Sequence, residues 1–246
     1  MRKVQQFFET SLGEAFYKSF LAEDRWQLYI KGIGTTLGVT VIALMIGIAI
    51  GIIVAMIRTG HDQQRNVRLT PSRVILNIFN VICKLYVTII RGTPAIVQLM
   101  ILGFVVFKSS RNFTMVGALG LGMNSGAYVA EIIRSGLMSV DGGQMEAGRS
   151  LGLNYLTTMI NIVIPQAIKN ILPALANEFI VLLKDTSLIS VIAGKELLYA
   201  AKSVGAKTYD YMFPLLGCAV VYLIFVIILS YVFGILERRL RTSDIR

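Results

Sequence analysis

Residues 32–57 read GIGTTLGVTVIALMIGIAIGIIVAMI, a run of 26 side chains without a charge. About 20 apolar residues are enough for an α-helix to cross the hydrocarbon core of a bilayer. A second uncharged run of 26 residues, 211–236, lies near the end of the chain. Both runs predict transmembrane helices. The composition agrees, because 55% of the 246 residues are hydrophobic and the mean hydropathy is +0.68.

The first part of the region between these runs is also apolar. Residues 74–107 contain Lys84 and Arg91 as their charged residues, and Pro94 predicts a helix that is kinked or broken near Gly92. We expect an amphipathic lead on the cytoplasmic side, followed by a second span.

Two further spans are expected at 112–130 and 173–192. The first is uncharged, and its small residues would let another helix approach closely, namely Gly117, Gly122 and Gly126. The second is apolar apart from Glu178, Lys184 and Asp185. The sequence therefore predicts an all-α integral membrane protein with five transmembrane helices.

An odd number of spans places the two ends of the chain on opposite sides of the membrane. Basic residues follow the first span, at Arg58, Arg65, Arg68 and Arg73, and recur in the tail ERRLRTSDIR. Lys and Arg concentrate on the cytoplasmic side. We therefore expect a multi-pass protein of a cell membrane with a cytoplasmic C-terminus.

The expected domains follow from this threading. Residues 1–31 form an extracytoplasmic segment, 32–240 the transmembrane domain and 241–246 a cytoplasmic tail. Charges fall throughout residues 1–31, which is unlike a secretory signal peptide, so we expect the first helix to be retained.

Several classes of protein and site are disfavoured by the composition. Cys83 and Cys218 lie far apart in apolar stretches and His61 is the only histidine, so we expect no disulfide framework and no metal site. The net charge is +10, but the positive residues lie beside hydrophobic segments, which predicts contact with membrane lipid and not with nucleic acid.

Residues 143–150, GQMEAGRS, differ by one side chain from the phosphate-binding pattern G-x-x-x-x-G-K-[ST], because Arg149 replaces the lysine. Such a loop requires a preceding strand and a βαβ context. Here the end of a membrane helix precedes it, so a nucleotide site is not expected. The apolar residues that follow instead have a rough helical spacing up to Pro165: Leu151, Leu153, Leu156, Met159, Ile160 and Val163. A short helix, a turn and a second short helix in a cytoplasmic loop would suit a docking element.

This loop resembles the EAA loop of the membrane subunits of ATP-binding-cassette importers. Glu146-Ala147-Gly148, three residues, Gly152, nine residues and then Ile162-Val163-Ile164-Pro165 match the pattern E-A-A-x3-G-x9-I-x-L-P. Gly148 and Ile164 depart from it, and Gly148 weakens a helix by roughly 1 kcal/mol relative to alanine. The segments RGTPAIVQL (91–99), NSGAYVAEIIRSG (124–136) and LLKDTSLISVI (182–192) are similar to the polar amino-acid permeases of this family.

The resemblance implies a permease subunit of a type I importer, with a coupling loop at 139–165 between helices 3 and 4. It implies a second permease subunit (homodimer or heterodimer), two ATPase subunits that bind ATP and Mg, and an extracytoplasmic binding protein. This chain would have no cofactor and no catalytic residue of its own. The residues expected to contact the ATPase are Glu146, Ala147, Gly148, Ser150, Leu151, Gly152 and Leu153.

A polar amino acid, the substrate that the resemblance implies, presents an ammonium group and a carboxylate. Asn124, Tyr128, Glu131 and Ser135 share one helical face. A carboxylate facing lipid costs at least ~2.5 to 3.5 kcal/mol, so Glu131 and Asp185 should be paired or line a polar path. The expected substrate-binding residues are Asn124, Ser125, Tyr128, Glu131, Asp185, Thr186 and Ser187.

A structural interpretation of the same carboxylates stays open. Glu131 or Asp185 would then pair with Lys184 or Arg134, and Glu178 would lock two helices together. Arg91 is expected to be an interfacial anchor or a helix-end pair.

Other classes of membrane protein compete with the importer. A secondary transporter usually shows two inverted halves, and neither the 124–135 nor the 182–192 pattern recurs. An ion channel not driven by ATP is disfavoured only by the EAA loop. An enzyme is least expected, because no nucleophile, metal cluster or catalytic dyad stands out.

Overall fold

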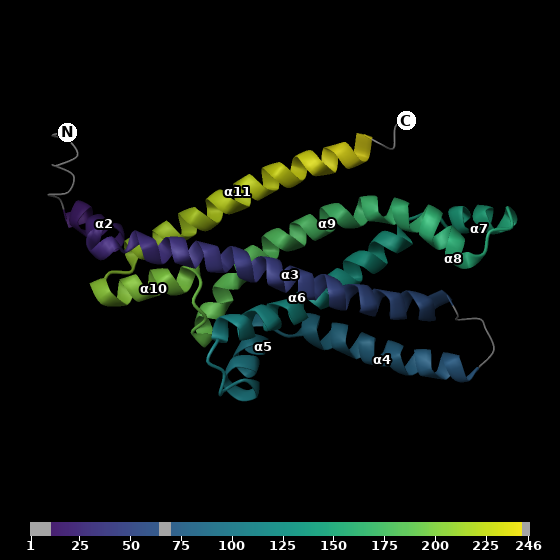
Figure 1. The fold of residues 1–246 in the computed structure, drawn as a ribbon, viewed down its shortest axis with the longest axis horizontal. Coiled ribbons are helices and arrows are strands. Elements are labelled where there is room, and N and C mark those ends of the chain that lie inside the picture. Colours follow the sequence, from purple (N-terminus) through teal and green to yellow (C-terminus); the bar gives the residue numbers. More distant parts are fainter. Residues whose placement is uncertain (1–10, 64–69, 243–246) are drawn as a thin grey trace. The chain divides into compact units, whose positions relative to one another are not determined.

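The structure, a computed structural model, describes residues 11–63 and 70–242, with side chains for 11–62 and 70–239. The described residues form helices joined by short turns and include no strand (Figure 1). The prediction of an all-α protein is confirmed. The orientation prediction used Arg65 and Arg68, which lie outside the described residues, as do 1–10 of the N-terminal segment and 243–246 of the tail.

Four helical segments among the described residues are long and apolar enough to cross a membrane: Ala22–Asp62, Pro71–Gly92, Phe113–Met138 and Met212–Arg239. The stretch expected as another span forms α9 (Ile164–Asp185) followed by the 3-10 turn η4 (Thr186–Ile192). A helix of 22 residues is roughly 33 Å long, enough to cross, but α9 also carries charged side chains such as Lys169 and Glu178. The count of five spans therefore stays a prediction.

One predicted boundary was wrong. Helix α9 begins nine residues before Pro173, which lies inside it. Helix α6 (Phe113–Met138) covers the uncharged run and continues past Glu131, as the predicted helical face from Asn124 to Ser135 requires. The second short helix, α8 (Tyr155–Thr158), is not isolated either, because the π-helical turn η3 (Met159–Val163) joins it to α9.

The predicted break near Gly92 is present. Helix α4 (Pro71–Gly92) ends there and α5 (Ala95–Ile101) begins after Pro94, with Thr93 extended between them. The ring of a proline disfavours helical backbone in the residue before it, which explains the extended Thr93. A π-helical turn, η2 (Leu102–Val106), follows α5.

The described chain divides into two compact units. The first takes in 11–42, 96–120 and 183–229, and the second takes in 43–63, 70–95, 121–182 and 230–242. The long helices α3 (Trp26–Gln63), α6, α9 and α11 (Met212–Thr242) each contribute to both units.

The first unit contains the shorter helices α2 (Ser11–Phe20), η1 (Ala22–Asp24) and α10 (Leu197–Thr208). Its core packs Tyr29 of α3 against Leu197, Ala201 and Val204 of α10 and Cys218 of α11. Figure 1 shows α2 and α10 beside the start of α3.

Glu196 caps this core and is fully buried. Its carboxylate accepts hydrogen bonds from the N–H groups of Leu198 and Tyr199, both at 2.7 Å, and from the Tyr222 hydroxyl at 3.1 Å. The Tyr222 hydroxyl also lies 3.3 Å from Thr186 Oγ1. The buried cap therefore connects α10 and α11 to the start of η4.

The second unit packs α3, α4 and α6 through small residues. A Cβ added to Gly126 would lie 2.8 Å from both Ile50 Cγ2 and the Tyr86 hydroxyl, and one added to Gly51 would lie 2.5 Å from Val129 Cγ1. The predicted close approach at glycines is confirmed here. Gly122 lies equally close to Ile46 of α3. Gly117, which belongs to the first unit, packs against Ile189 of the same unit. Remaining in this unit are α7 (Gly142–Ser150) and α8.

The buried cap generates a pH-dependence prediction. Burial raises the pKa of Glu196 from 4.5 to about 7, although backbone N–H groups and Tyr222 favour the ionised form. A raised folded-state pKa means that stability is greatest below the unfolded pKa and is lost as pH rises through the folded pKa. The melting temperature in detergent should therefore decrease as the pH is raised from about 4.5 to about 7.5. Glu196→Gln should flatten this fall, and an equal fall in the variant would show that another group causes it.

Candidate functional site

The loop between α6 and α9 folds into two short helices with defined ends. Asp141 caps α7 by accepting a hydrogen bond from the Gly143 N–H at 2.7 Å. Asn154 caps α8 in the same way, from the Thr157 N–H at 2.8 Å. Side chains that satisfy the first N–H groups of a helix fix where it begins.

Gly152 ends α7. Its φ of +84° lies in the left-handed region, and the N–H groups of Gly152 and Leu153 donate to the carbonyls of Arg149 and Gly148. This is the Schellman arrangement, which favours glycine at the left-handed position. The turn requires Gly152, which the sequence motif singled out without showing its backbone conformation.

Gly148 replaces the alanine of the motif for a visible reason. A Cβ added there would lie 2.5 Å from Thr158 Cγ2 and 2.8 Å from its Oγ1. Both residues are buried. The glycine therefore lets α7 and α8 pack closely (Figure 1), which offsets its low helix propensity.

The outer surface of this helix pair is apolar and exposed. Leu151 is 82% exposed and Leu156 64% exposed, while Leu153 is 37% exposed. Glu146, Ala147, Arg149 and Ser150 are exposed beside them. Exposed apolar residues rimmed by polar ones are typical of protein interaction surfaces.

Inside the second unit, one carboxylate joins three helices. Glu131 of α6 forms an ion pair with Arg58 of α3 and lies 3.7 Å from Arg91 of α4. The Arg91 guanidinium also lies over the Tyr128 ring, 5.2 Å from its centroid. Glu131 thus pairs, but with two arginines and not with Arg134 or Lys184. Arg134 lies 3.8 Å from Asp62.

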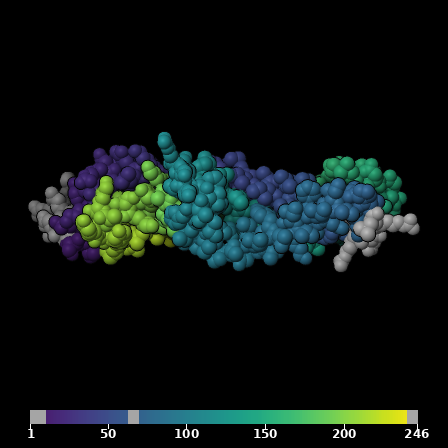
Figure 2. Space-filling model, turned by 90° about the horizontal axis from the view of Figure 1, so that it is seen from below, coloured from purple at the N-terminus to yellow at the C-terminus, as the bar shows by residue number. Residues whose placement is uncertain are grey.

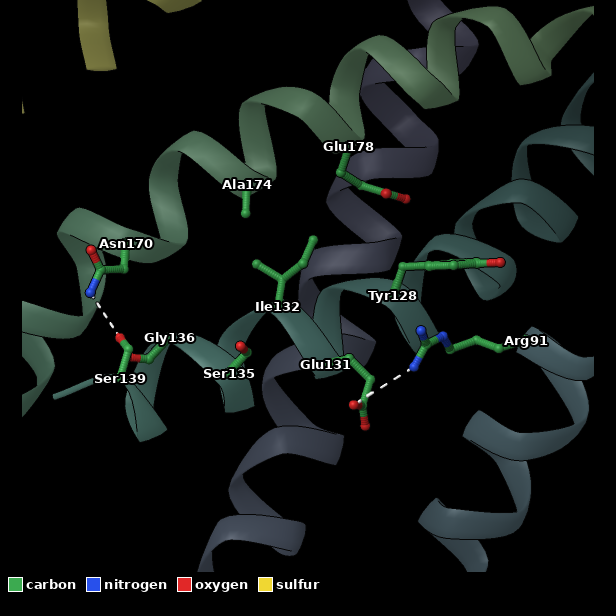
Figure 3. Close-up of a pocket in the computed structure, with 10 residues that line it drawn as sticks. All are labelled: Arg91, Tyr128, Glu131, Ile132, Ser135, Gly136, Ser139, Asn170, Ala174 and Glu178. Atoms are coloured by element: carbon green, nitrogen blue, oxygen red, sulfur yellow. Dashed lines mark hydrogen bonds and ion pairs between the residues drawn. The ribbon is translucent and has the colours of Figure 1, made fainter. Parts of the chain in front are cut away.

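A cavity of about 430 Å³ opens beside this cluster (Figure 3). Its walls include Arg91, Tyr128 and Glu131, and Figure 3 shows Glu178 projecting toward it from α9. The Ser125 hydroxyl donates to Glu178 at 2.7 Å, which joins α6 to α9. At the other end, the Asn170 amide donates to the Ser139 hydroxyl at 2.8 Å. The cavity walls therefore include hydrogen-bonding groups and both signs of charge among apolar side chains.

Three predicted substrate residues lie in the first unit: Asp185, Thr186 and Ser187. Asp185 is the last residue of α9, where the α-helix tightens into the 3-10 turn η4. The hydroxyls of Thr186 and Ser187 donate to the carbonyls of Leu183 and Lys184, both at 2.7 Å. Within the described chain, the Asp185 carboxylate makes no hydrogen bond or ion pair. A negative charge at a helix C-terminus is also electrostatically unfavourable.

Sequence reasoning placed some of these residues correctly and missed others. Tyr128 and Glu131 share the cavity, as their helical spacing predicted, and Asn124 and Ser125 are buried one turn away. Arg58 was used only for orientation, and its role as partner of Glu131 was missed because 73 residues separate them. The available signal was that Arg58 directly follows one uncharged run and Glu131 directly follows another, which favours an ion pair between the two helices.

Metal chemistry finds no support in the described residues. They contain no group of three or more His, Cys, Asp or Glu side chains that could hold an ion. Cys83 and Cys218 are both buried and free.

Comparisons with known proteins come from sequence and structure. Residues 72–242 match the family of binding-protein-dependent transport system inner membrane components. GlnP of Rickettsia bellii (strain RML369-C), named for a glutamine transport system permease, is 37% identical over 217 residues, 87% of this chain and 93% of that protein. The arginine transport system permease protein ArtQ of Bacillus subtilis (strain 168) is 34% identical, with 87% and 93% covered.

A solved structure resembles the chain equally well. It is described as the crystal structure of an amino acid ABC transporter with histidines. The identity is 37%, the TM-score is 0.76, and the match covers 87% of this chain and 94% of that one.

The three-helix ion cluster generates a stability prediction. Glu131→Gln leaves the partly buried Arg58 without its carboxylate, which should destabilise the chain by about 1 to 3 kcal/mol. The melting temperature in detergent should fall, and Arg58→Met added to Glu131→Gln should restore part of it. A wild-type melting temperature in Glu131→Gln would show that the cluster is not structural.

Proposed function

Because the chain belongs to the family of binding-protein-dependent transport system inner membrane components, we propose that it is the permease subunit of an ATP-driven importer of a polar amino acid. It spans the cytoplasmic membrane several times and forms part of the translocation pathway. The observation that carries the proposal is the exposed apolar surface of α7 and α8 in a family member whose relatives are amino-acid permeases.

Coupling to ATP occurs through the loop. An ATPase subunit, which binds ATP and Mg, presents a groove to the exposed residues of the predicted contact set: Glu146, Ala147, Ser150, Leu151, Gly152 and Leu153. Gly148 is buried on Thr158 and holds α7 against α8. Leu151 is the anchor, because a side chain 82% exposed in the isolated chain gains most from burial. Gly152 orients Leu151 and Leu153 by its left-handed turn.

The assembly contains two permease subunits, either identical or sister chains, and two ATPase subunits. A binding protein delivers substrate at the extracytoplasmic face. The segment 1–31 lies on that face and the C-terminus lies in the cytoplasm. Since relatives are named for glutamine and for arginine, the substrate class is a polar amino acid.

Substrate recognition uses both groups of polar residues. Asp185 receives the substrate ammonium, because its carboxylate has no hydrogen bond or ion pair within the described chain and sits where an α-helix turns into a 3-10 turn. Glu131 and Tyr128 contact the substrate in the cavity, where two arginines pair with Glu131, and Asn124 acts from its buried position one turn away. Thr186, Ser187 and Ser125 support these sites.

No feature of the described residues favours a gradient-driven transporter or a channel. The expected difference between these classes and an importer is the need for an ATPase partner.

Leu151→Asp tests the docking surface. A charge in place of the anchor should abolish retention of ATPase subunits during purification, while the permease still inserts and keeps its melting temperature. Tyr209→Asp is the matched control, because Tyr209 is 94% exposed and lies outside the loop, between α10 and α11. Equal ATPase retention in Leu151→Asp and wild type would contradict the docking role.

Asp185→Asn tests the substrate site in the assembled complex. Removing the charge at unchanged volume should reduce substrate-stimulated ATP hydrolysis at least about tenfold, since a charge-assisted bond to the ammonium is lost. Expression and melting temperature should stay at the wild-type level. Asp210→Asn is the isosteric control, because asparagine keeps the cap on the Met212 N–H. A lower melting temperature in Asp185→Asn, with normal stimulation, would assign Asp185 a structural role.

A further inference from the structure

Glu196, Tyr222 and Thr186 form a chain of polar contacts inside the first unit. The Tyr222 hydroxyl lies 3.1 Å from Glu196 Oε2 and 3.3 Å from Thr186 Oγ1. The Thr186 hydroxyl lies 2.7 Å from the carbonyl oxygen of Leu183, in the last turn of α9. The chain of contacts therefore runs from the cap of α10, through α11, to the first residue of η4.

The number of protons in this chain depends on the ionisation of Glu196. Each of the three contacts joins two oxygen atoms, so each needs one proton to be a hydrogen bond. The Tyr222 and Thr186 hydroxyls supply one proton each, and an ionised carboxylate supplies none. With Glu196 ionised, two protons serve three contacts, and one pair of oxygens meets without a proton. With Glu196 protonated, three protons serve the three contacts.

The surroundings do not replace the missing proton. The N–H groups that reach Glu196, from Leu198 and Tyr199, donate to its carboxylate and not to the contacts along the chain. The Thr36 hydroxyl of α3 also bonds to the Tyr222 side chain, but it adds a contact together with its proton. Glu196 and the threonine at the far end of the chain are both fully buried, so bulk water does not reach them.

The groups that face Glu196 leave it free to change its protonation. Lys202, on the same helix, is the cation that acts on it, while α11 presents Tyr222 and the Cys218 thiol, and α3 and η4 present threonine hydroxyls. Figure 2 shows α10, in yellow-green, at the surface of the molecule, and Lys202 is exposed to solvent. Burial outweighs this cation and the hydrogen-bond donors, and raises the pKa of Glu196 to about 7.

The far end of the chain lies beside the proposed ammonium site, because Thr186 directly follows Asp185. We propose that Glu196 is a positioning residue whose protonated form holds Thr186, and with it Asp185, in the arrangement that binds the substrate. Ionisation of Glu196 removes one hydrogen bond from the chain and releases the start of η4. The inference rests on the proposed function and deepens it, because it makes the affinity for the amino acid depend on pH.

Equilibrium binding to the assembled permease–ATPase complex in detergent, without binding protein, tests the dependence on pH. The probe is radiolabelled glutamine or arginine, whichever the wild-type complex binds. Since Glu196 is protonated at the lower pH, the dissociation constant should rise about fivefold from pH 6 to pH 8, the effect of one hydrogen bond. A dissociation constant that is equal at both values, or that falls, would overturn the proposal.

Two variants separate positioning from capping. Tyr222→Phe removes the middle of the chain, so its dissociation constant should match the wild-type value at pH 8 under both conditions. Glu196→Gln donates to Tyr222 at every pH and should stay near the wild-type value at pH 6. Tyr231→Phe is the matched control, because Tyr231 also lies on α11 but is 72% exposed, and it should keep the wild-type dependence. A lower melting temperature in Tyr222→Phe with the wild-type dependence intact would assign the chain a structural role only.

Amide hydrogen exchange tests the release of η4 without substrate. After correction for the intrinsic effect of pH on exchange, protection of residues 186–192 should decrease about fivefold from pH 6 to pH 8 in the wild type, and should not change in Glu196→Gln. Constant protection in the wild type would overturn the control of η4 by Glu196. If the wild-type complex binds no amino acid, the proposed function fails, whereas the exchange measurement still decides whether Glu196 controls η4.

Discussion

A charged or polar group inside the hydrocarbon core has no water to bond with, so it must find a partner in the protein or a wet cavity. The second unit meets this constraint at two carboxylates that lie largely away from solvent. Glu131 forms ion pairs with an arginine of α3 and an arginine of α4, and Glu178 accepts a hydrogen bond from the Ser125 hydroxyl. Because these contacts join α3, α4, α6 and α9, satisfying the charges also holds the second unit together. Among the described residues, Asp185 has no ion pair, and this is why we propose that it meets the ammonium of the substrate.

The proposed coupling surface is continuous in sequence with the proposed substrate residues. From Tyr155, the chain runs through α8, η3 and α9 as an uninterrupted helical segment to Asp185. Close packing of Gly148 on Thr158 attaches α7 to the start of this segment. If the loop is the coupling surface, as we propose, its displacement by an ATPase partner would act on a helix that carries both Glu178 and Asp185. The buried Glu196 then connects the following turn, through Tyr222 and Thr186, to α10 and α11.

The sequence predicted the helical class, the break at Pro94 and the close packing at glycines, because each depends on local chemistry. Uncharged runs reveal spans, proline removes a helical N–H, and glycine removes a side chain. The start of α9 could not be predicted, since Pro173 lies inside the helix and not at its beginning, and the partners of Glu131 were not predicted either. Those partners are remote in sequence, as Arg58 shows. The cavity beside Tyr128 and the buried cap at Glu196 likewise depend on residues from several helices, and no local pattern reveals them.

The central claim is that a partner ATPase, and no ion gradient, drives amino-acid entry through this chain. Purified permease, ATPase and binding proteins in proteoliposomes, with ionophores that abolish every ion gradient, measure this directly. The account predicts accumulation of a labelled polar amino acid that requires ATP on the ATPase side and persists with the ionophores present. Uptake that is independent of ATP and is abolished by the ionophores would contradict it.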